Sequence, residues 1–75
     1  MPNQDPVQLE RMRRAIAALP EPIGAAYRLH LFGGLDYPAI ARMLGVDALE
    51  VERRIAEAIV LIDRDLRRQE RGGTP

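Results

Sequence analysis

Apolar residues recur every three or four positions along most of the chain, which is the spacing of one face of an α-helix. Proline and glycine divide this pattern into four segments, and we expect helices at residues 5–19, 21–32, 36–44 and 47–69. No linker or repeat separates these segments, so residues 1–75 are expected to form a single domain. The pattern therefore predicts an all-α fold of four helices, of which the last is the longest.

The first two predicted helices differ in how much of their surface is apolar. Asp5 and Pro6 begin the first helix, as a capping residue followed by proline at the first helical position. Its apolar stripe consists of Leu9, Met12, Ile16 and Leu19, and its opposite side carries Glu10, Arg11, Arg13 and Arg14. The second helix leaves almost no polar face, because it contains Ile23, Ala25, Ala26, Tyr27, Leu29, Leu31 and Phe32. These compositions predict an ordinary amphipathic helix followed by a central helix that is covered on several sides.

Residues 36–62 have the pattern of a helix-turn-helix. Asp36 can cap the first helix of the pair, and Gly45 can end it because glycine adopts the left-handed conformation needed there. Asp47 and Glu50 have the spacing of a capping box at the start of the second helix. The second helix continues the apolar stripe through Val51, Ile55, Ala58 and Ile62. Such a unit can place its second helix in the major groove of DNA, although many helical pairs share the pattern without binding nucleic acid.

Between Leu19 and Ile62 a set of landmark residues follows a known family without a gap. The landmarks are Leu19, Pro20, Glu21, Tyr27, Leu29, Leu31, Phe32, Gly34, Leu35, Tyr37, Ile40, Ala41, Leu44, Gly45, Val46, Val51, Arg54, Ala58 and Ile62. In these positions the chain resembles region 4 of bacterial RNA polymerase sigma factors, in particular the extracytoplasmic-function type. The resemblance implies a domain that binds the upstream promoter element and docks on RNA polymerase. Because no counterpart of the promoter-melting sigma region is present, the chain is not expected to initiate transcription alone.

The predicted recognition helix departs from that family. Its candidate DNA-binding residues are Leu49, Glu50, Glu52, Arg53, Arg54, Ala56 and Glu57, where sigma region 4 typically carries threonine, serine, lysine and arginine. From Asp47 to Ile62 there are four acids and two arginines, which gives a net charge of −2. Carboxylates repel phosphate, and this helix is therefore expected to bind DNA less well than a typical sigma region 4.

Apolar residues on the same helix suggest a different role. Leu49, Val60 and Leu61 are expected on or beside its exposed side, and several exposed apolar residues on one helix face can form a protein interface.

A lone histidine, His30, falls in the second helix and is interpreted as a packing residue that makes a hydrogen bond.

Composition excludes several classes of function. The chain has no cysteine and no serine, and it has no glycine-rich loop with phosphate-binding spacing, so neither an enzyme, a metal site nor a cofactor is expected. The apolar runs are too short to span a membrane and the N-terminus does not resemble a signal peptide, which favours a cytoplasmic protein. The net charge is zero, with eleven arginines and eleven acids, whereas a DNA-binding domain usually carries a positive excess.

Two hypotheses follow for function. The first is a stand-alone sigma region 4-like protein that regulates transcription by binding promoter DNA, RNA polymerase or both. The second is a degenerate sigma-like module that has lost DNA binding and instead binds proteins, by mimicking a sigma factor toward an anti-sigma factor, by docking on RNA polymerase or by forming a homodimer.

Overall fold

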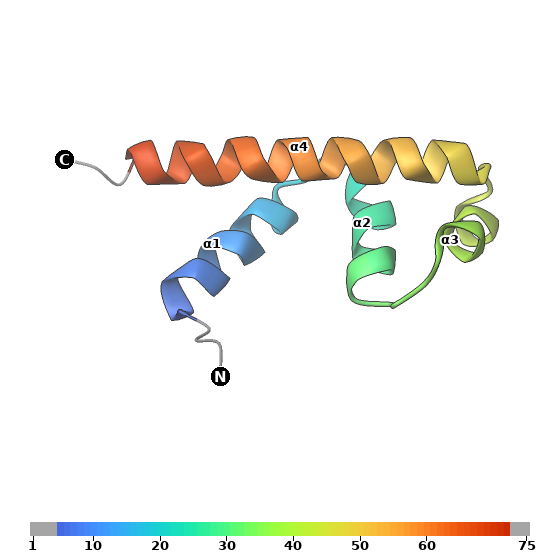
Figure 1. Ribbon diagram of the computed structural model, residues 1–75, viewed down its shortest axis with the longest axis horizontal. Helices are drawn as coiled ribbons and strands as arrows, with labels where there is room; N and C mark the ends of the chain where they lie inside the picture. Colours follow the sequence, from blue (N-terminus) through green and yellow to red (C-terminus); the bar gives the residue numbers. More distant parts are fainter. Residues whose placement is uncertain (1–4, 73–75) are drawn as a thin grey trace.

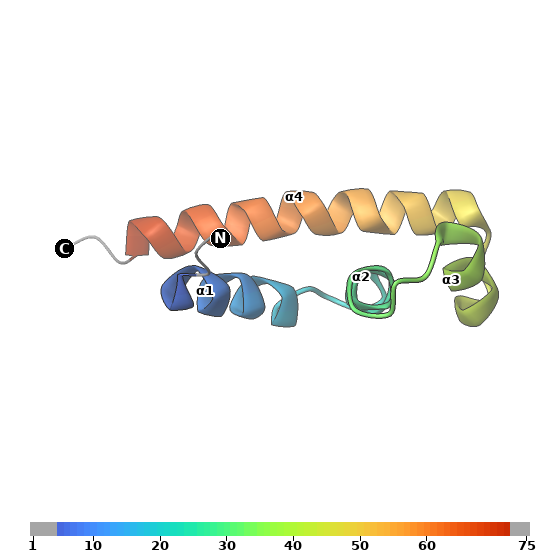
Figure 2. The ribbon, with the colours of Figure 1, turned by 60° about the horizontal axis from the view of Figure 1, so that its bottom comes forward.

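The computed structural model describes residues 5–72, and these form four helices and no strand. The helices are α1 (Pro6–Ala17), α2 (Ile23–Leu31), α3 (Tyr37–Leu44) and α4 (Ala48–Gly72). Two views show α4 as a long straight helix, with α1, α2 and α3 all placed on one side of it (Figures 1 and 2). The predicted all-α fold with a C-terminal helix-turn-helix is therefore confirmed.

Aspartate side chains cap three of the four helices. The Val7 N–H donates to Asp5 Oδ1 at 2.9 Å, the Ala39 N–H donates to Asp36 Oδ1 at 2.9 Å, and the Glu50 N–H donates to Asp47 Oδ1 at 2.8 Å. Each bond satisfies an N–H group that has no partner within its own helix. At the end of α3, Gly45 has a φ of 70° and a ψ of 32°, the left-handed conformation that turns the chain toward α4.

The core consists of two adjoining clusters along α4. The first cluster joins α1 to the middle of α4 and contains Ala15, Ile16, Leu19, Ala58 and Ile62. The second cluster joins α2, α3 and the start of α4, and contains Ala26, Ile40, Ala41, Val51 and Ile55. Tyr27 packs against both clusters, and Leu44 packs against the second. The buried stripe of α4 is thus the one that the sequence predicts.

The end of α4 is attached to α1 by polar contacts. Gln69 donates from Nε2 to the Arg11 carbonyl oxygen at 3.1 Å and to Asp65 Oδ2 at 3.0 Å. Leu66 packs against the first core cluster. These contacts support α4 beyond the helix-turn-helix, and the helix extends to Gly72 rather than ending near Gln69.

Two predictions about α1 and α2 are wrong. Leu9 and Met12 belong to the predicted apolar stripe of α1 but are exposed, because the buried apolar contact of α1 with α4 is made by Ala15, Ile16 and the following Leu19. Leu31 and Phe32 are also exposed, so the C-terminal end of α2 is not covered as its composition suggested. The reason is geometric, since α2 crosses α4 steeply and its C-terminal end projects away from that helix (Figure 1).

Candidate recognition surface

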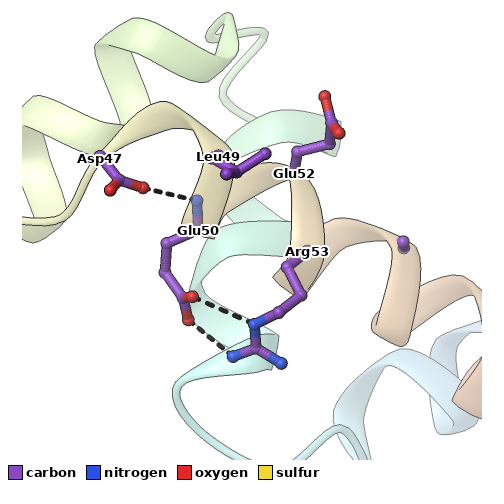
Figure 3. Close-up of a pocket in the computed structure, with 6 residues that line it drawn as sticks. Asp47, Leu49, Glu50, Glu52 and Arg53 are labelled. Carbon is purple, nitrogen blue, oxygen red and sulfur yellow. Dashed lines mark hydrogen bonds and ion pairs between the residues drawn. The ribbon is translucent and has the colours of Figure 1, made fainter.

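The first two turns of α4 present one side to solvent. Leu49 is 73% exposed, and Glu52, Arg53 and Ala56 are exposed on the same side. With Asp47 and Glu50 they line a shallow depression of about 480 Å³ (Figure 3). This is the position at which a helix-turn-helix presents its recognition helix to base edges.

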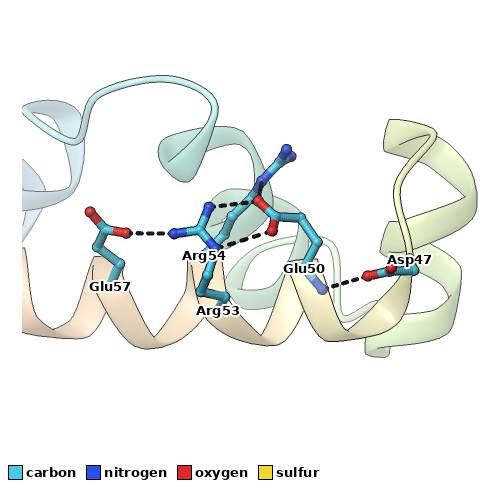
Figure 4. Close-up of polar contacts among 5 residues, drawn as sticks. All are labelled: Asp47, Glu50, Arg53, Arg54 and Glu57. Atoms are coloured by element: carbon cyan, nitrogen blue, oxygen red, sulfur yellow. Dashed lines mark hydrogen bonds and ion pairs between the residues drawn. The ribbon is translucent and has the colours of Figure 1, made fainter.

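Ion pairs within α4 engage both arginines near this surface. Arg53 Nη2 lies 2.6 Å from Glu50 Oε2, and Arg53 Nη1 lies 3.1 Å from Glu57 Oε1. Arg54 Nε lies 2.9 Å from the same Glu50 oxygen (Figure 4). The guanidinium groups of Arg53 and Arg54 are therefore both paired with carboxylates of the same helix, and neither is an unpaired cation that could bind a phosphate.

The structure separates the seven candidate DNA-binding residues into two groups. The exposed group contains Leu49, Glu52, Arg53, Ala56 and Glu57. Glu50 and Arg54 are half-buried, and the Arg54 side chain is only 13% exposed because it turns toward the core side of α4. The residues that face outward near the start of α4 therefore carry two carboxylates and one guanidinium.

The candidate protein-interface residues are also divided. Leu49 and Val60 are exposed, but Leu61 packs against the cluster between α1 and α4. Leu61 was expected on or beside the exposed side, and it is half-buried, because one residue is about 100° of helix rotation and carries Leu61 from Val60 toward α1. Ile59 is 57% exposed and was not among the apolar residues expected on this side.

A second apolar surface was missed by the sequence analysis. It lies between α1 and the end of α2 and is lined by Leu9, Met12, Ile16, Leu31 and Phe32, together with Pro6, Glu10 and Arg13. Phe32, one of the lining residues, is 70% exposed. We refer to Leu9, Met12, Ile16, Leu31 and Phe32 as the α1–α2 surface. The hollow that this surface lines has a volume of about 470 Å³. Large apolar patches on small proteins commonly mark protein interfaces.

A family model described as sigma-70, region 4, matches residues 9–62, which cover α1 from Leu9, all of α2 and α3, and α4 as far as Ile62. The chain belongs to the sigma-70 region 4 family. No curated protein and no solved structure gives a significant match.

Membership of the sigma-70 region 4 family accounts for the architecture around both surfaces. The family match begins at Leu9, ten residues before the resemblance recognised from Leu19, and so includes most of α1. Sigma-70 region 4 has a general role in transcription through DNA binding, and it is a non-enzymatic fold. Within residues 5–72 no helix is long and apolar enough to cross a membrane, and no group of side chains has the composition of a metal site.

His30 has the structural role expected of it. Its Nδ1 lies 3.0 Å from the Leu35 carbonyl oxygen, and its ring meets the Tyr37 ring edge-on with centroids 5.2 Å apart. These contacts connect the end of α2 with the start of α3.

The capping box at the start of α4 is only half formed. Asp47 accepts from the Glu50 N–H, but the Glu50 carboxylate turns along the helix to the two arginines. Hydrogen bonds from Arg53, and then from Arg54, lower the pKa of Glu50 from 4.5 to about 2. The carboxylate that could have closed the box instead neutralises the arginines of the recognition helix.

This lowered pKa predicts a pH dependence for the folded protein. A carboxyl group whose pKa is lowered by folding stabilises the native state above its unfolded pKa, and that contribution is lost as pH falls toward the folded pKa. For Glu50 the loss is expected between pH 4.5 and about 2. Urea unfolding followed by circular dichroism should show a shallower decrease in stability across this range for Glu50→Gln than for the parent.

Two other glutamates serve as a check on this assignment. Arg13 lowers the pKa of Glu10, and Arg28 lowers the pKa of Glu21, so both also contribute to acid sensitivity. Glu50→Gln should therefore reduce the slope of folding stability against pH without removing it. A slope equal to that of the parent would show that the Glu50 ion pairs are not maintained in solution.

Proposed function

We propose that this sigma-70 region 4 protein regulates transcription in the cytoplasm by docking on RNA polymerase through the α1–α2 surface, with DNA contact as a weak secondary interaction. Sigma region 4 domains in general bind DNA and RNA polymerase. The observation that carries the proposal is the exposed apolar cluster of Leu9, Met12, Leu31 and Phe32 inside the part of the chain that matches the family.

The chemistry of this surface suits a protein partner. Its lining is almost entirely apolar, and the nearby charges of Glu10 and Arg13 neutralise each other at 2.6 Å. A neutral apolar surface does not attract the phosphate groups of DNA, but it can bury the apolar face of a helix from another protein. Aromatic and methionine side chains are enriched at protein interfaces, which agrees with Phe32 and Met12 here.

The charges of α4 support only a minor role for DNA. Non-specific DNA affinity comes mainly from cations that replace the counterions of phosphates. In α4 the guanidinium of Arg53 is paired with Glu50 and Glu57, and Glu52 adds a further negative charge beside it. A promoter contact by this helix therefore relies on the polymerase to hold it near DNA.

The proposal predicts that Phe32→Ala weakens binding to core RNA polymerase by about tenfold or more, because truncating a large aromatic anchor of a protein contact costs about 2 kcal/mol or more and about 1.4 kcal/mol is tenfold. The matched control is Met43→Ala, because Met43 is a comparably exposed large apolar residue on α3 that does not line the α1–α2 surface. Fluorescence anisotropy of the labelled protein, titrated with purified polymerase, measures both affinities. Equal weakening by both variants, or no binding by the parent, would reject the docking site.

Promoter DNA is a second candidate ligand, favoured by the intact geometry of the helix-turn-helix. The Asp36 cap, the left-handed Gly45 and the open side of α4 at Leu49 are all in place. Submicromolar and salt-sensitive binding of a promoter duplex without polymerase would make DNA the main ligand. An anti-sigma factor is a third candidate, and binding to such a protein without binding to polymerase would favour sigma mimicry.

A further inference from the structure

The helices α1, α2 and α3 leave one side of α4 uncovered along its length. All three lie on the same side of α4 in both views (Figures 1 and 2). The helix has 25 residues, which corresponds to a length of about 37 Å. We define its outer face by Leu49, Arg53, Ala56, Val60, Asp63 and Arg67, all of which are exposed. Ile59 lies at the edge of this face and is also exposed.

The residues of the outer face follow one another at alternating intervals of four and three. This is the interval of a seam through which two helices pack side by side. Its middle is apolar, with Ala56, Ile59 and Val60, and Leu49 adds a large apolar side chain near one end. The seam is too polar for a buried core helix but is suited to a reversible contact.

The charge of α4 changes sign along its length. Residues 47–62 carry a net charge of −2, whereas residues 63–71 contain four arginines and three acids and carry a net charge of +1. Glu52 in the first part and Arg64 in the second are exposed, and neither makes an ion pair with another described residue. A second α4 in the antiparallel direction would place the negative part of each helix beside the positive part of the other.

We propose that two copies of this chain associate through the outer faces of their α4 helices, packed antiparallel about a two-fold axis near the level of Ala58. In this register Ala56 of each copy faces Val60 of its partner, and Arg53 lies level with Asp63 of the partner. The axis also brings the two Glu57 side chains near each other, and each is neutralised by its own Arg53 at 3.1 Å. This contact covers the surface that would face DNA, so association and DNA binding by α4 exclude each other.

Sedimentation equilibrium over a wide concentration range tests the association. The parent is expected to shift from 8.4 kDa toward twice that mass as its concentration rises. Val60→Glu should remain at 8.4 kDa with unchanged helicity, because it places a charge at the centre of the contact. A parent that stays monomeric at millimolar concentration overturns the proposal and leaves the face to DNA or a foreign protein. A Val60→Glu variant that still dimerises also overturns it.

A pair of charge-reversed variants tests the antiparallel arrangement. Glu52→Lys with Glu57→Arg makes both parts of α4 positive, and Arg64→Glu with Arg67→Glu makes both parts negative. Each variant alone should be monomeric, whereas an equimolar mixture should form a heterodimer that weakens as salt rises. Arg13→Glu with Arg42→Glu is the control, since it reverses two exposed charges elsewhere and should dimerise as the parent does. A mixture that stays monomeric overturns the antiparallel pairing.

This inference does not rest on the proposed docking to polymerase, because the two use different surfaces. Loss of polymerase binding on Phe32→Ala concerns the α1–α2 surface, and loss of dimer on Val60→Glu concerns the outer face of α4. If one of these two results is not obtained, the proposal tested by the other result is unaffected.

Discussion

Replacing Ile55 by alanine is expected to remove about 2–5 kcal/mol of folding stability. Ile55 is 4% exposed and packs in the cluster that joins α2, α3 and α4, where its removal leaves a cavity. A domain of 75 residues has a total stability of about 4–11 kcal/mol, so this single change can unfold much of the population. Urea unfolding monitored by circular dichroism at low protein concentration measures the loss.

Ile59 provides a control of the same residue type one turn further along α4. It is 57% exposed, so Ile59→Ala removes the same atoms from a site that is already in contact with water. The change is expected to cost less than about 0.5 kcal/mol. If the two variants lose similar stability, the face of α4 assigned to the core is wrong.

The difference between Ile55 and Ile59 illustrates what the sequence could predict. The period of the apolar residues identifies Val51, Ile55, Ala58 and Ile62 as one stripe, and the structure buries all four. Aspartate and glycine at the helix ends give the element boundaries to within a few residues, because capping and the left-handed turn depend on local geometry. These features depend on neighbours in the sequence.

Features that depend on the angle between helices could not be predicted in this way. Leu9 looks like a core residue because it falls on the apolar stripe of an amphipathic helix, and Phe32 looks like one because it ends an apolar segment with few polar positions. Whether another helix covers them depends on how α1 and α2 cross α4, and no local pattern specifies that angle. The α1–α2 surface therefore became visible only in the folded chain.

The electrostatics of the recognition helix were predicted in sign but not in detail. The excess of acids from Asp47 to Ile62 was evident in the sequence. The capping-box spacing suggested that Glu50 would bond back to the start of the helix, but two arginines at three and four residues' distance compete for its carboxylate. The Glu50 carboxylate bonds to the arginines because it is attracted more strongly to a positively charged guanidinium group than to a neutral backbone N–H.

The second large effect is expected for DNA binding. Glu52→Lys with Glu57→Arg should raise the affinity of the protein for duplex DNA, because it changes the charge of the exposed side of α4 by four. The variant also frees Arg53 from one of its two carboxylate partners. The gain should be tolerant of sequence, since phosphate contacts carry no information about bases.

Salt dependence shows whether this gain is electrostatic. Two new phosphate contacts steepen the slope of log affinity against log salt by roughly two, so the advantage over the parent should shrink by about tenfold between 50 and 200 mM salt. Titration of a labelled random duplex pool into the parent and the variant, at both salt concentrations, measures the slopes. Arg64→Glu with Arg67→Glu provides the opposite change, and it should bind DNA no better than the parent.

Two outcomes would contradict this account of the recognition helix. If the parent binds a particular duplex tightly and the variant binds it worse, then Glu52 and Glu57 read base edges by accepting hydrogen bonds from cytosine amino groups. If neither protein binds DNA at low salt, added cations on this helix do not reach phosphate, either because a second copy of the chain covers the helix or because the fold does not place it to enter the major groove. Sedimentation of the same samples separates the two causes, because a variant that still dimerises is covered by a second copy, whereas a monomeric variant that does not bind DNA holds α4 where its cations cannot reach phosphate.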